Sequence, residues 1–191
     1  MSISSKRFAT VALVVAAAQT AILGYMIESR AGVLRYGHEV LLKTAPVDPR
    51  DLLRGDYVVL TYDISRIDSS LISGEWPTSN PLPPLAVRLK AEPEAYWSVV
   101  EASFGSLSRT DGTVILAASV DSPVQWQSLP SDLRVSYGIE RYYVPEGEGK
   151  LIEDGRNEGR VSVAVRISDT GQGQIRALML DGEPLYEEPL Y

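Results

Sequence analysis

Residues 8–27 read FATVALVVAAAQTAILGYMI, an apolar stretch of 20 residues without a charged side chain. Lys6 and Arg7 precede it directly, and Glu28 and Arg30 follow it. Because an α-helix rises 1.5 Å per residue, 20 residues match the roughly 30 Å hydrocarbon core of a bilayer. The stretch therefore predicts a transmembrane helix, with the lipid bilayer as the first partner of the chain.

A cleaved secretory signal peptide is the alternative interpretation of this stretch. Residues 11–15 form a short apolar region, and Ala16, Ala17 and Ala18 before Gln19 resemble a small-residue cleavage site. The apolar character continues well past this site, as far as the end of the stretch. This continuation favours an uncleaved anchor, and the cleavage alternative stays open.

The charges that flank the stretch predict its orientation. Lys6 and Arg7 lie at the N-terminal end, and positive charges flanking a membrane helix favour the cytoplasmic side. We therefore expect residues 1–7 in the cytoplasm, a single pass through the cytoplasmic (inner) membrane, and residues 28–191 on the outer side.

The charge balance of the water-facing part excludes some partners. The chain has 18 Lys+Arg and 25 Asp+Glu, and Lys6 and Arg7 are the only charged side chains before Glu28. Residues 28–191 therefore have 16 basic and 25 acidic side chains, a net charge of −9. Binding to a phosphate backbone needs a clustered basic surface, so we expect no nucleic-acid partner. There is no cysteine, hence no disulfide and no thiol ligand or nucleophile.

The rest of the chain shows the alternation of apolar and polar residues that is typical of β-strands. In residues 57–64, for example, Val58, Leu60, Tyr62 and Ile64 fall on one face. No long amphipathic helix separates these segments, which favours antiparallel pairing. We predict a mainly β domain, either an antiparallel barrel or a sandwich, with two possible lobes at about 34–80 and 82–185. The predicted strands are 39–43, 57–64, 85–90, 96–104, 113–120, 133–143, 161–167 and 174–180.

Two short helical turns are expected between the strands. In the first, Asp48 is a suitable N-cap, Pro49 fits the first helical position, and Gly55 fits the C-terminal end. The second is predicted at residues 147–157, although Gly149 and Gly155 lower the helix propensity there.

Two segments resemble the GDYXXLXY family. Residues 46–62 read PVDPRDLLRGDYVVLTY, and residues 140–149 read ERYYVPEGEG, similar to the C-terminal half of that family. The resemblance covers most of residues 32–185. It implies a small bacterial protein, commonly with one N-terminal membrane helix and without a known activity, and some relatives occur alongside polytopic membrane proteins.

The residues of these segments are the candidate functional residues. We favour a structural role for them, with Asp56 bonded to turn amides or paired with Arg54 and with Leu60 and Tyr62 in the core. A ligand-binding or catalytic role of Asp56 and Tyr57 is the alternative. The full set is Asp48, Arg50, Arg54, Gly55, Asp56, Tyr57, Leu60, Tyr62, Glu140, Arg141, Tyr142, Tyr143 and Glu146.

The remaining inventory of reactive side chains is small. Without cysteine and with His38 as the single histidine, no zinc or iron site and no cofactor are expected. A Ser-His-Asp triad would need His38, and no Gly-x-Ser-x-Gly segment occurs. A Ser-Lys dyad remains open, with Lys43, Lys90 or Lys150 as the base.

Two functions follow from these observations. The favoured one is a non-enzymatic envelope protein whose β domain binds another membrane protein, with Gln19, Thr20 and Gly24 as possible contacts between helices. The alternative is a small membrane-tethered hydrolase of the Ser/Lys type.

Overall fold

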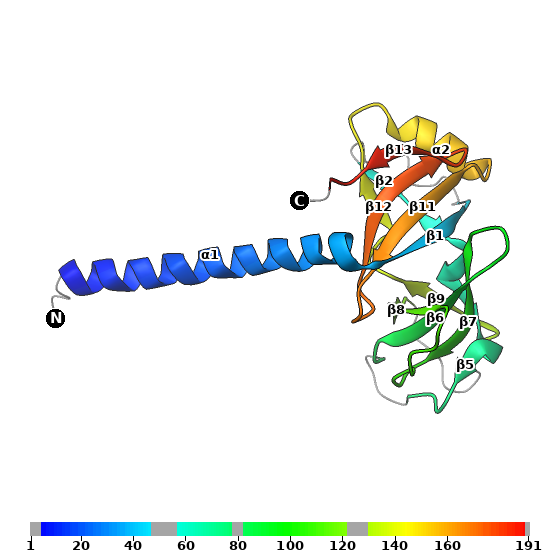
Figure 1. Ribbon diagram of the computed structural model, residues 1–191, viewed down its shortest axis with the longest axis horizontal. Helices are drawn as coiled ribbons and strands as arrows, with labels where there is room; N and C mark the ends of the chain where they lie inside the picture. The colour runs from blue at the N-terminus through cyan, green and yellow to red at the C-terminus, as the bar shows by residue number, and fades with distance from the viewer. Residues whose placement is uncertain (1–4, 47–56, 78–81, 122–129, 190–191) are drawn as a thin grey trace.

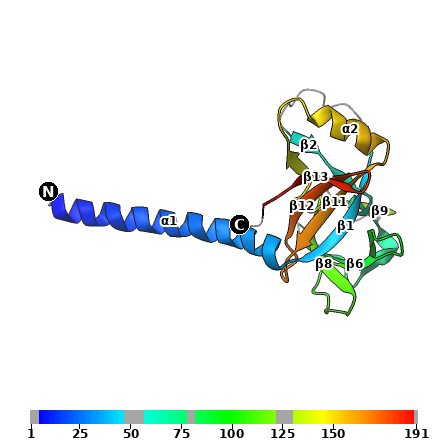
Figure 2. The ribbon, with the colours of Figure 1, turned by 45° about the horizontal axis from the view of Figure 1, so that its top comes forward.

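The computed structural model describes residues 5–46, 57–77, 82–121 and 130–189. A long helix, α1 (Ser5–Tyr36), projects from a domain made mostly of β-strands, as two views show (Figures 1 and 2). The mainly β fold with one long apolar N-terminal helix confirms the fold class predicted from the sequence.

The first sheet has five strands in the order β13–β12–β11–β1–β3, and all neighbours pair antiparallel. Inward-facing Val40 and Leu42 of β1 alternate with outward-facing Glu39, Leu41 and Lys43, because successive side chains of a strand point to opposite faces. The strands are β1 (His38–Ala45), β3 (Thr61–Tyr62), β11 (Val161–Ile167), β12 (Gly173–Leu180) and β13 (Glu183–Glu187).

The second sheet has six strands in the order β4–β9–β8–β6–β7–β5. Its pairs are antiparallel except for β5, which runs parallel to β7. The strands are β4 (Arg66–Asp68), β5 (Ile72–Ser73), β6 (Leu85–Ala91), β7 (Trp97–Ser103), β8 (Thr113–Val120) and β9 (Asp132–Ser136).

A third, two-stranded sheet pairs β2 (Tyr57–Val59) with β10 (Arg141–Tyr143). Helix α2 (Gly149–Asn157) and two short 3-10 turns, η1 (Asp63–Ser65) and η2 (Ser69–Leu71), complete the described elements. The sheets are open, so the barrel alternative is wrong. All three sheets contribute to one hydrophobic cluster, as in a sandwich. The boundary between two lobes near residue 81 stays a prediction.

Two predicted strands are each divided in the structure. The strand at 57–64 is divided at Leu60 into β2 and β3, which belong to different sheets. It ends at Tyr62, where the Ser65 hydroxyl accepts the Tyr62 backbone N–H at 3.2 Å and η1 begins. The strand at 133–143 is split by Gly138, whose φ of +78° favours glycine. The predicted face is confirmed nonetheless, because Val58, Leu60, Tyr62 and Ile64 are all buried.

The two predicted helical turns have different outcomes. The turn expected at 48–55 lies outside the described residues. The turn expected at 147–157 is confirmed as α2. Gly155 leaves little room for a side chain, because a Cβ there would lie 2.7 Å from Cδ1 of Leu180 and 3.2 Å from Cγ2 of Val161.

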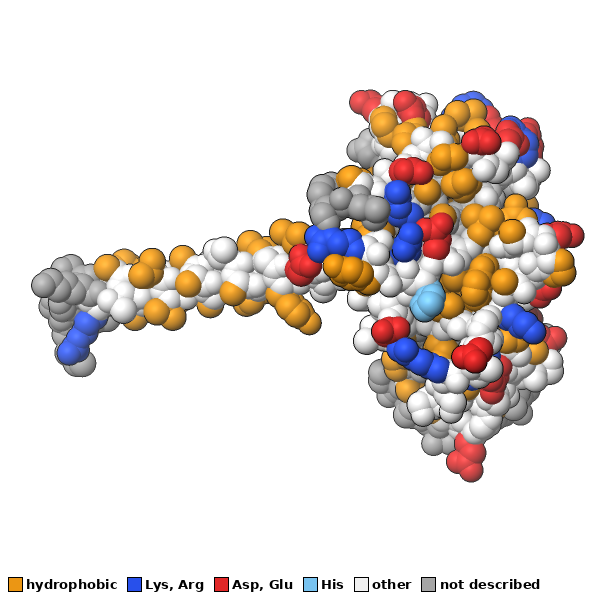
Figure 3. Space-filling model, viewed as in Figure 1, with side chains coloured by type: hydrophobic (Ala, Val, Ile, Leu, Met, Phe, Trp, Pro, Cys, Tyr) orange, Lys and Arg blue, Asp and Glu red, His pale blue; other side chains and the backbone are white. Residues whose placement is uncertain are grey.

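Helix α1 is long enough to cross a bilayer and continues beyond the predicted span of 8–27. Its apolar part, Arg7–Tyr36, has a mean hydropathy of 1.9 over the best window, none of which is buried against the domain. Hydrophobic side chains lie along the projecting rod, whereas charged ones lie at its two ends and on the domain (Figure 3). These features fit a membrane anchor, and a signal sequence near the N-terminus shares them.

The last turns of α1 are packed on the domain rather than joined to it by a linker. Ala31, Val33 and Leu34 are buried, and the helix contacts β11 and β12. The Gly37 N–H donates to the Val33 carbonyl at 2.9 Å, and Arg166 donates to the Gly37 carbonyl at 3.1 Å. The orientation of the domain relative to the anchor is therefore fixed by direct contacts.

Substitution of Gly37 tests this junction. A Cβ at Gly37 would lie 2.5 Å from the Val33 carbonyl and 3.0 Å from the backbone of Ile167, so Gly37→Ala should cost about 1–3 kcal/mol of unfolding free energy. Gly32→Ala is the matched control, because its Cβ meets nothing within 4 Å and alanine favours the helix. Thermal unfolding of the full chain in detergent measures both, and equal stability of the two variants would contradict a tight junction.

Candidate functional site

The two segments that resemble the family lie side by side in the structure. Tyr57 pairs with Tyr143, Val58 with Tyr142, and Val59 with Arg141 in the ladder between β2 and β10. The Leu60 N–H then donates to the Glu140 carbonyl at 2.8 Å, which extends the contact past the ladder. Segments that are far apart in sequence therefore form one structural unit.

The inner face of this unit is held by two tyrosines with reciprocal contacts. The Tyr62 hydroxyl donates to the Ile139 carbonyl at 2.6 Å, and the Tyr137 hydroxyl donates to the Ile64 carbonyl at 2.6 Å. Both side chains are buried. Each hydroxyl donates to a backbone carbonyl that lies two residues after the other tyrosine. The pair therefore holds the end of β3 against the segment before β10. The motif residue Tyr62 is thus a core residue.

Tyrosine ionisation should destabilise the domain at alkaline pH. Burial raises the pKa of Tyr62 and Tyr137, and the Glu140 carboxylate raises both further. Burial, with a contribution from Glu188, also raises the pKa of Tyr142 to about 12. A raised pKa in the folded state means that the unfolded chain loses protons first, so the contribution of these tyrosines to stability is constant below about pH 10 and is lost as the pH rises above it.

The urea midpoint between pH 8 and pH 11.5 measures this effect, with tyrosinate absorbance as the direct probe. Tyr62→Phe should reduce the fall in stability above pH 10. A midpoint that is independent of pH over this range would contradict the burial of these hydroxyls.

The outer face of the two strands is an exposed surface that we call the motif platform, formed by Tyr57, Val59, Arg141 and Tyr143. The two tyrosine rings lie 6.0 Å apart, and the Arg141 guanidinium lies 5.7 Å from the centre of the Tyr57 ring. Tyr143 is 73% exposed and Val59 is 38% exposed. Aromatic rings with an arginine are typical of protein-binding surfaces.

Arg156 of α2 supports the platform from behind and was not found from the sequence. Its Nη1 donates to the Val59 carbonyl. Arg156 follows the buried Ile152 by four residues, so helical periodicity places both on the same face. This spacing was the signal that could have identified Arg156 as a buried residue.

The other predicted site residues have separate outcomes. Asp48, Arg50, Arg54, Gly55 and Asp56 lie outside the described residues, so the contacts expected for Asp56 stay a prediction. The carboxylate of Glu140 accepts the Tyr137 N–H, which gives Glu140 a structural contact, whereas Glu146 is exposed.

The described residues do not assemble a Ser-Lys dyad. Lys43, Lys90 and Lys150 are all exposed. Within the described ranges, Lys150 Nζ forms an ion pair with Asp154 Oδ2 at 3.0 Å on the surface of α2. None of the three donates to a serine in a cleft, which was the geometry required by the hydrolase alternative.

His38 lines an open hollow of about 240 Å³ beside the end of α1. Arg109 and Asp169 form an exposed ion pair of 3.0 Å at the same hollow. In the part of the chain that the structure describes, no hydrogen bond joins His38 to a serine or a carboxylate. The His38 side chain therefore lies at the surface, close to the end of α1.

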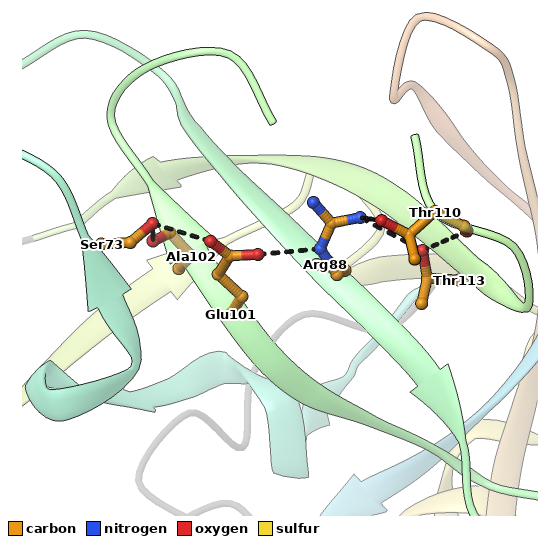
Figure 4. A network of polar contacts seen from close by, with 6 residues as sticks. All are labelled: Ser73, Arg88, Glu101, Ala102, Thr110 and Thr113. Carbon is orange, nitrogen blue, oxygen red and sulfur yellow. Dashed lines mark hydrogen bonds and ion pairs between the residues drawn. The ribbon is translucent and has the colours of Figure 1, made fainter. Parts of the chain in front are cut away.

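A buried arginine organises the second sheet (Figure 4). Nε of Arg88 donates to Glu101 at 2.9 Å, and Nη1 donates to the hydroxyls of Thr110 and Thr113 at 3.0 and 3.2 Å. Ser73 donates to the other oxygen of Glu101 at 2.9 Å. Hydrogen bonds from Arg88 and then Ser73 lower the pKa of Glu101. The network ties β5 and the loop before β8 to the strands between them, which is a structural role.

One comparison with known proteins identifies a family for this chain. The family model described as GDYXXLXY protein matches residues 19–178, from the middle of α1 to the end of β12. No curated protein and no solved structure matches the chain. Because the family model covers most of the chain, including both paired segments, the protein belongs to the GDYXXLXY family.

Proposed function

We propose that this protein is a single-pass protein of the cytoplasmic membrane whose outer β domain binds another envelope membrane protein. In this proposal, residues 1–7 stay in the cytoplasm, α1 is an uncleaved anchor, and the motif platform is the contact surface. The main support for this proposal is the direct packing of α1 on β11 and β12. If α1 is the anchor, this packing holds the platform in one orientation relative to the bilayer.

The exposed helix supports a contact within the membrane. Side chains of Gln19 and Thr20 are exposed along α1, and nothing lies within 4 Å of a Cβ built on Gly24. Small and polar residues allow helices to approach closely in lipid. A partner with membrane helices could therefore contact α1 and the domain together.

The platform supports a contact outside the membrane. Tyrosine and arginine contribute strongly to binding when they become buried at the centre of an interface. The exposed Tyr143 and Val59 lie next to Arg141, which already stacks on Tyr57. The surface is thus ordered before binding, which reduces the entropy cost of association.

Photocrosslinking in native membranes tests the proposal. A photoreactive residue at Tyr143 or at Gly24 of the full-length protein should give the same membrane-protein product. The control position is Val100 of β7, which is also exposed and lies in the second sheet. A product formed from all three positions alike, or from none of them, would contradict a defined partner at the platform.

Truncation of the platform should weaken the complex without unfolding the domain. We expect Tyr143→Ala to reduce the affinity for the crosslinked partner roughly 30-fold, as for a hot-spot residue of an interface. The stability of the free protein should change little, because Tyr143 is mostly exposed. Binding measured after copurification checks the first effect and thermal unfolding checks the second.

A further inference from the structure

Arg156 is a buried cation without a carboxylate partner among the described residues. Its side chain lies in the last turn of α2, and the residue is only 5% exposed. The other well-covered arginines, Arg88, Arg166 and Arg176, each form an ion pair with a glutamate. Because burial of an unpaired charge is costly, the uncompensated guanidinium of Arg156 requires an explanation.

The hydrogen bonds of Arg156 leave one edge of the guanidinium open. Nη1 donates to the Val59 carbonyl, and Nη2 makes a long contact of 3.4 Å with Oδ1 of Asn157. Nε is buried and has no partner within the described part of the chain. Nε and Nη2 form the edge of a planar guanidinium that can donate to two oxygens of a carboxylate or a phosphate.

The surroundings of this edge include one carboxylate and one exposed carboxamide. Burial lowers the pKa of Arg156, and the Glu153 carboxylate one turn earlier partly offsets this effect without forming an ion pair. Asn157 is exposed, and its carboxamide oxygen accepts the one hydrogen bond that this edge makes among the described residues. Displacement of this side chain would leave both donors of the edge, Nε and Nη2, without a protein partner.

We propose that the Nε–Nη2 edge of Arg156 is a binding site for an oxyanion, a carboxylate or a phosphate, which displaces the carboxamide of Asn157. Two oxygens of the ligand accept from Nε and Nη2, while Nη1 stays bonded to Val59. The site lies directly behind β2, so an anion there would hold the strand that presents Tyr57 and Val59 on the motif platform. This site goes beyond the proposed function and does not depend on a membrane partner.

Thermal unfolding of the full chain in detergent tests the site. Sodium phosphate or sodium acetate is titrated against sodium chloride at constant ionic strength. At ten times the Kd, binding should raise the Tm by roughly 3–6 °C, and the rise should saturate. Arg156→Met should abolish the response, and Lys150→Met, at an exposed position of the same helix, should retain it. An equal response of Arg156→Met, or no saturable response of the wild type to either anion, would overturn the proposal.

A second variant keeps the test decisive if Arg156→Met does not fold. Asn157→Glu places a carboxylate beside the open edge, so it should raise the Tm in chloride and remove the response to phosphate and acetate. A response of Asn157→Glu equal to that of the wild type would overturn the site. In the wild type, a response to phosphate alone would assign a phosphate ligand, and a response to both anions would assign a carboxylate as well.

Discussion

Tyr62→Ala should lower the free energy of unfolding by about 3–5 kcal/mol, the largest effect on stability that we expect for a single substitution in the β domain. The side chain is 1% exposed in the main hydrophobic cluster, and its loss also leaves the Ile139 carbonyl without its hydroxyl donor. Urea unfolding of the full chain in detergent measures the change. Tyr62→Phe separates the two contributions, with an expected cost of about 1–3 kcal/mol for the unsatisfied carbonyl alone.

Tyr143→Ala is the matched control for this prediction. Tyr143 belongs to the neighbouring strand of the same motif unit but is mostly exposed, so its replacement should change stability by about 0.5 kcal/mol or less. A similar loss of stability for Tyr62→Ala and Tyr143→Ala would show that the two faces of this unit do not differ as described.

Two charges in the middle of the apolar stretch should prevent membrane insertion. Each arginine at the centre of a membrane helix costs about 2.5–3.5 kcal/mol, so Ala17→Arg with Ala18→Arg should cost about 5–7 kcal/mol. Extraction of membranes with alkaline carbonate measures the result, and the double variant should leave the pellet. Ala17→Leu with Ala18→Leu is the control and should stay in the pellet. Retention of the arginine variant would contradict a transmembrane position for α1.

Local patterning was sufficient to predict most of the fold. The predicted bounds of β8 and β11 were correct. The predicted face of Val58, Leu60 and Tyr62 was also correct, because burial of one side of a strand constrains every second residue. The short strands β4, β5 and β13 were not predicted. Segments of two to five residues are too short for an alternating pattern to stand out.

The extent of α1 shows where sequence reasoning reached its limit. Glu28, Arg30 and Arg35 end the apolar stretch, yet the helix continues to Tyr36 because its last turns are packed on the domain and Glu28 pairs with Arg35 at 2.9 Å. Composition predicts the part of a helix that lipid surrounds. The part of α1 that continues beyond the apolar stretch depends on the tertiary contacts of Ala31 and Leu34.

The residues of the candidate site were predicted from the sequence, but the surface that they form together was not. The resemblance identified both segments, whereas their pairing depends on long-range contacts between β2 and β10 that no local pattern encodes. The separation of the motif into buried Tyr62 and exposed Tyr143 also depends on the register of that pairing. Arg156 was missed because a charged residue in a glycine-containing helix is normally expected on the outside.

Protease digestion of right-side-out membrane vesicles tests the central claim most directly. With a tag at each end of the full-length protein, protease added outside should degrade the C-terminal domain and leave the N-terminal tag protected, and the protein should remain in the carbonate-insoluble pellet. A soluble protein whose mature chain begins at Gln19, or a domain that resists protease until the vesicles are opened, would contradict an uncleaved anchor that holds the domain outside.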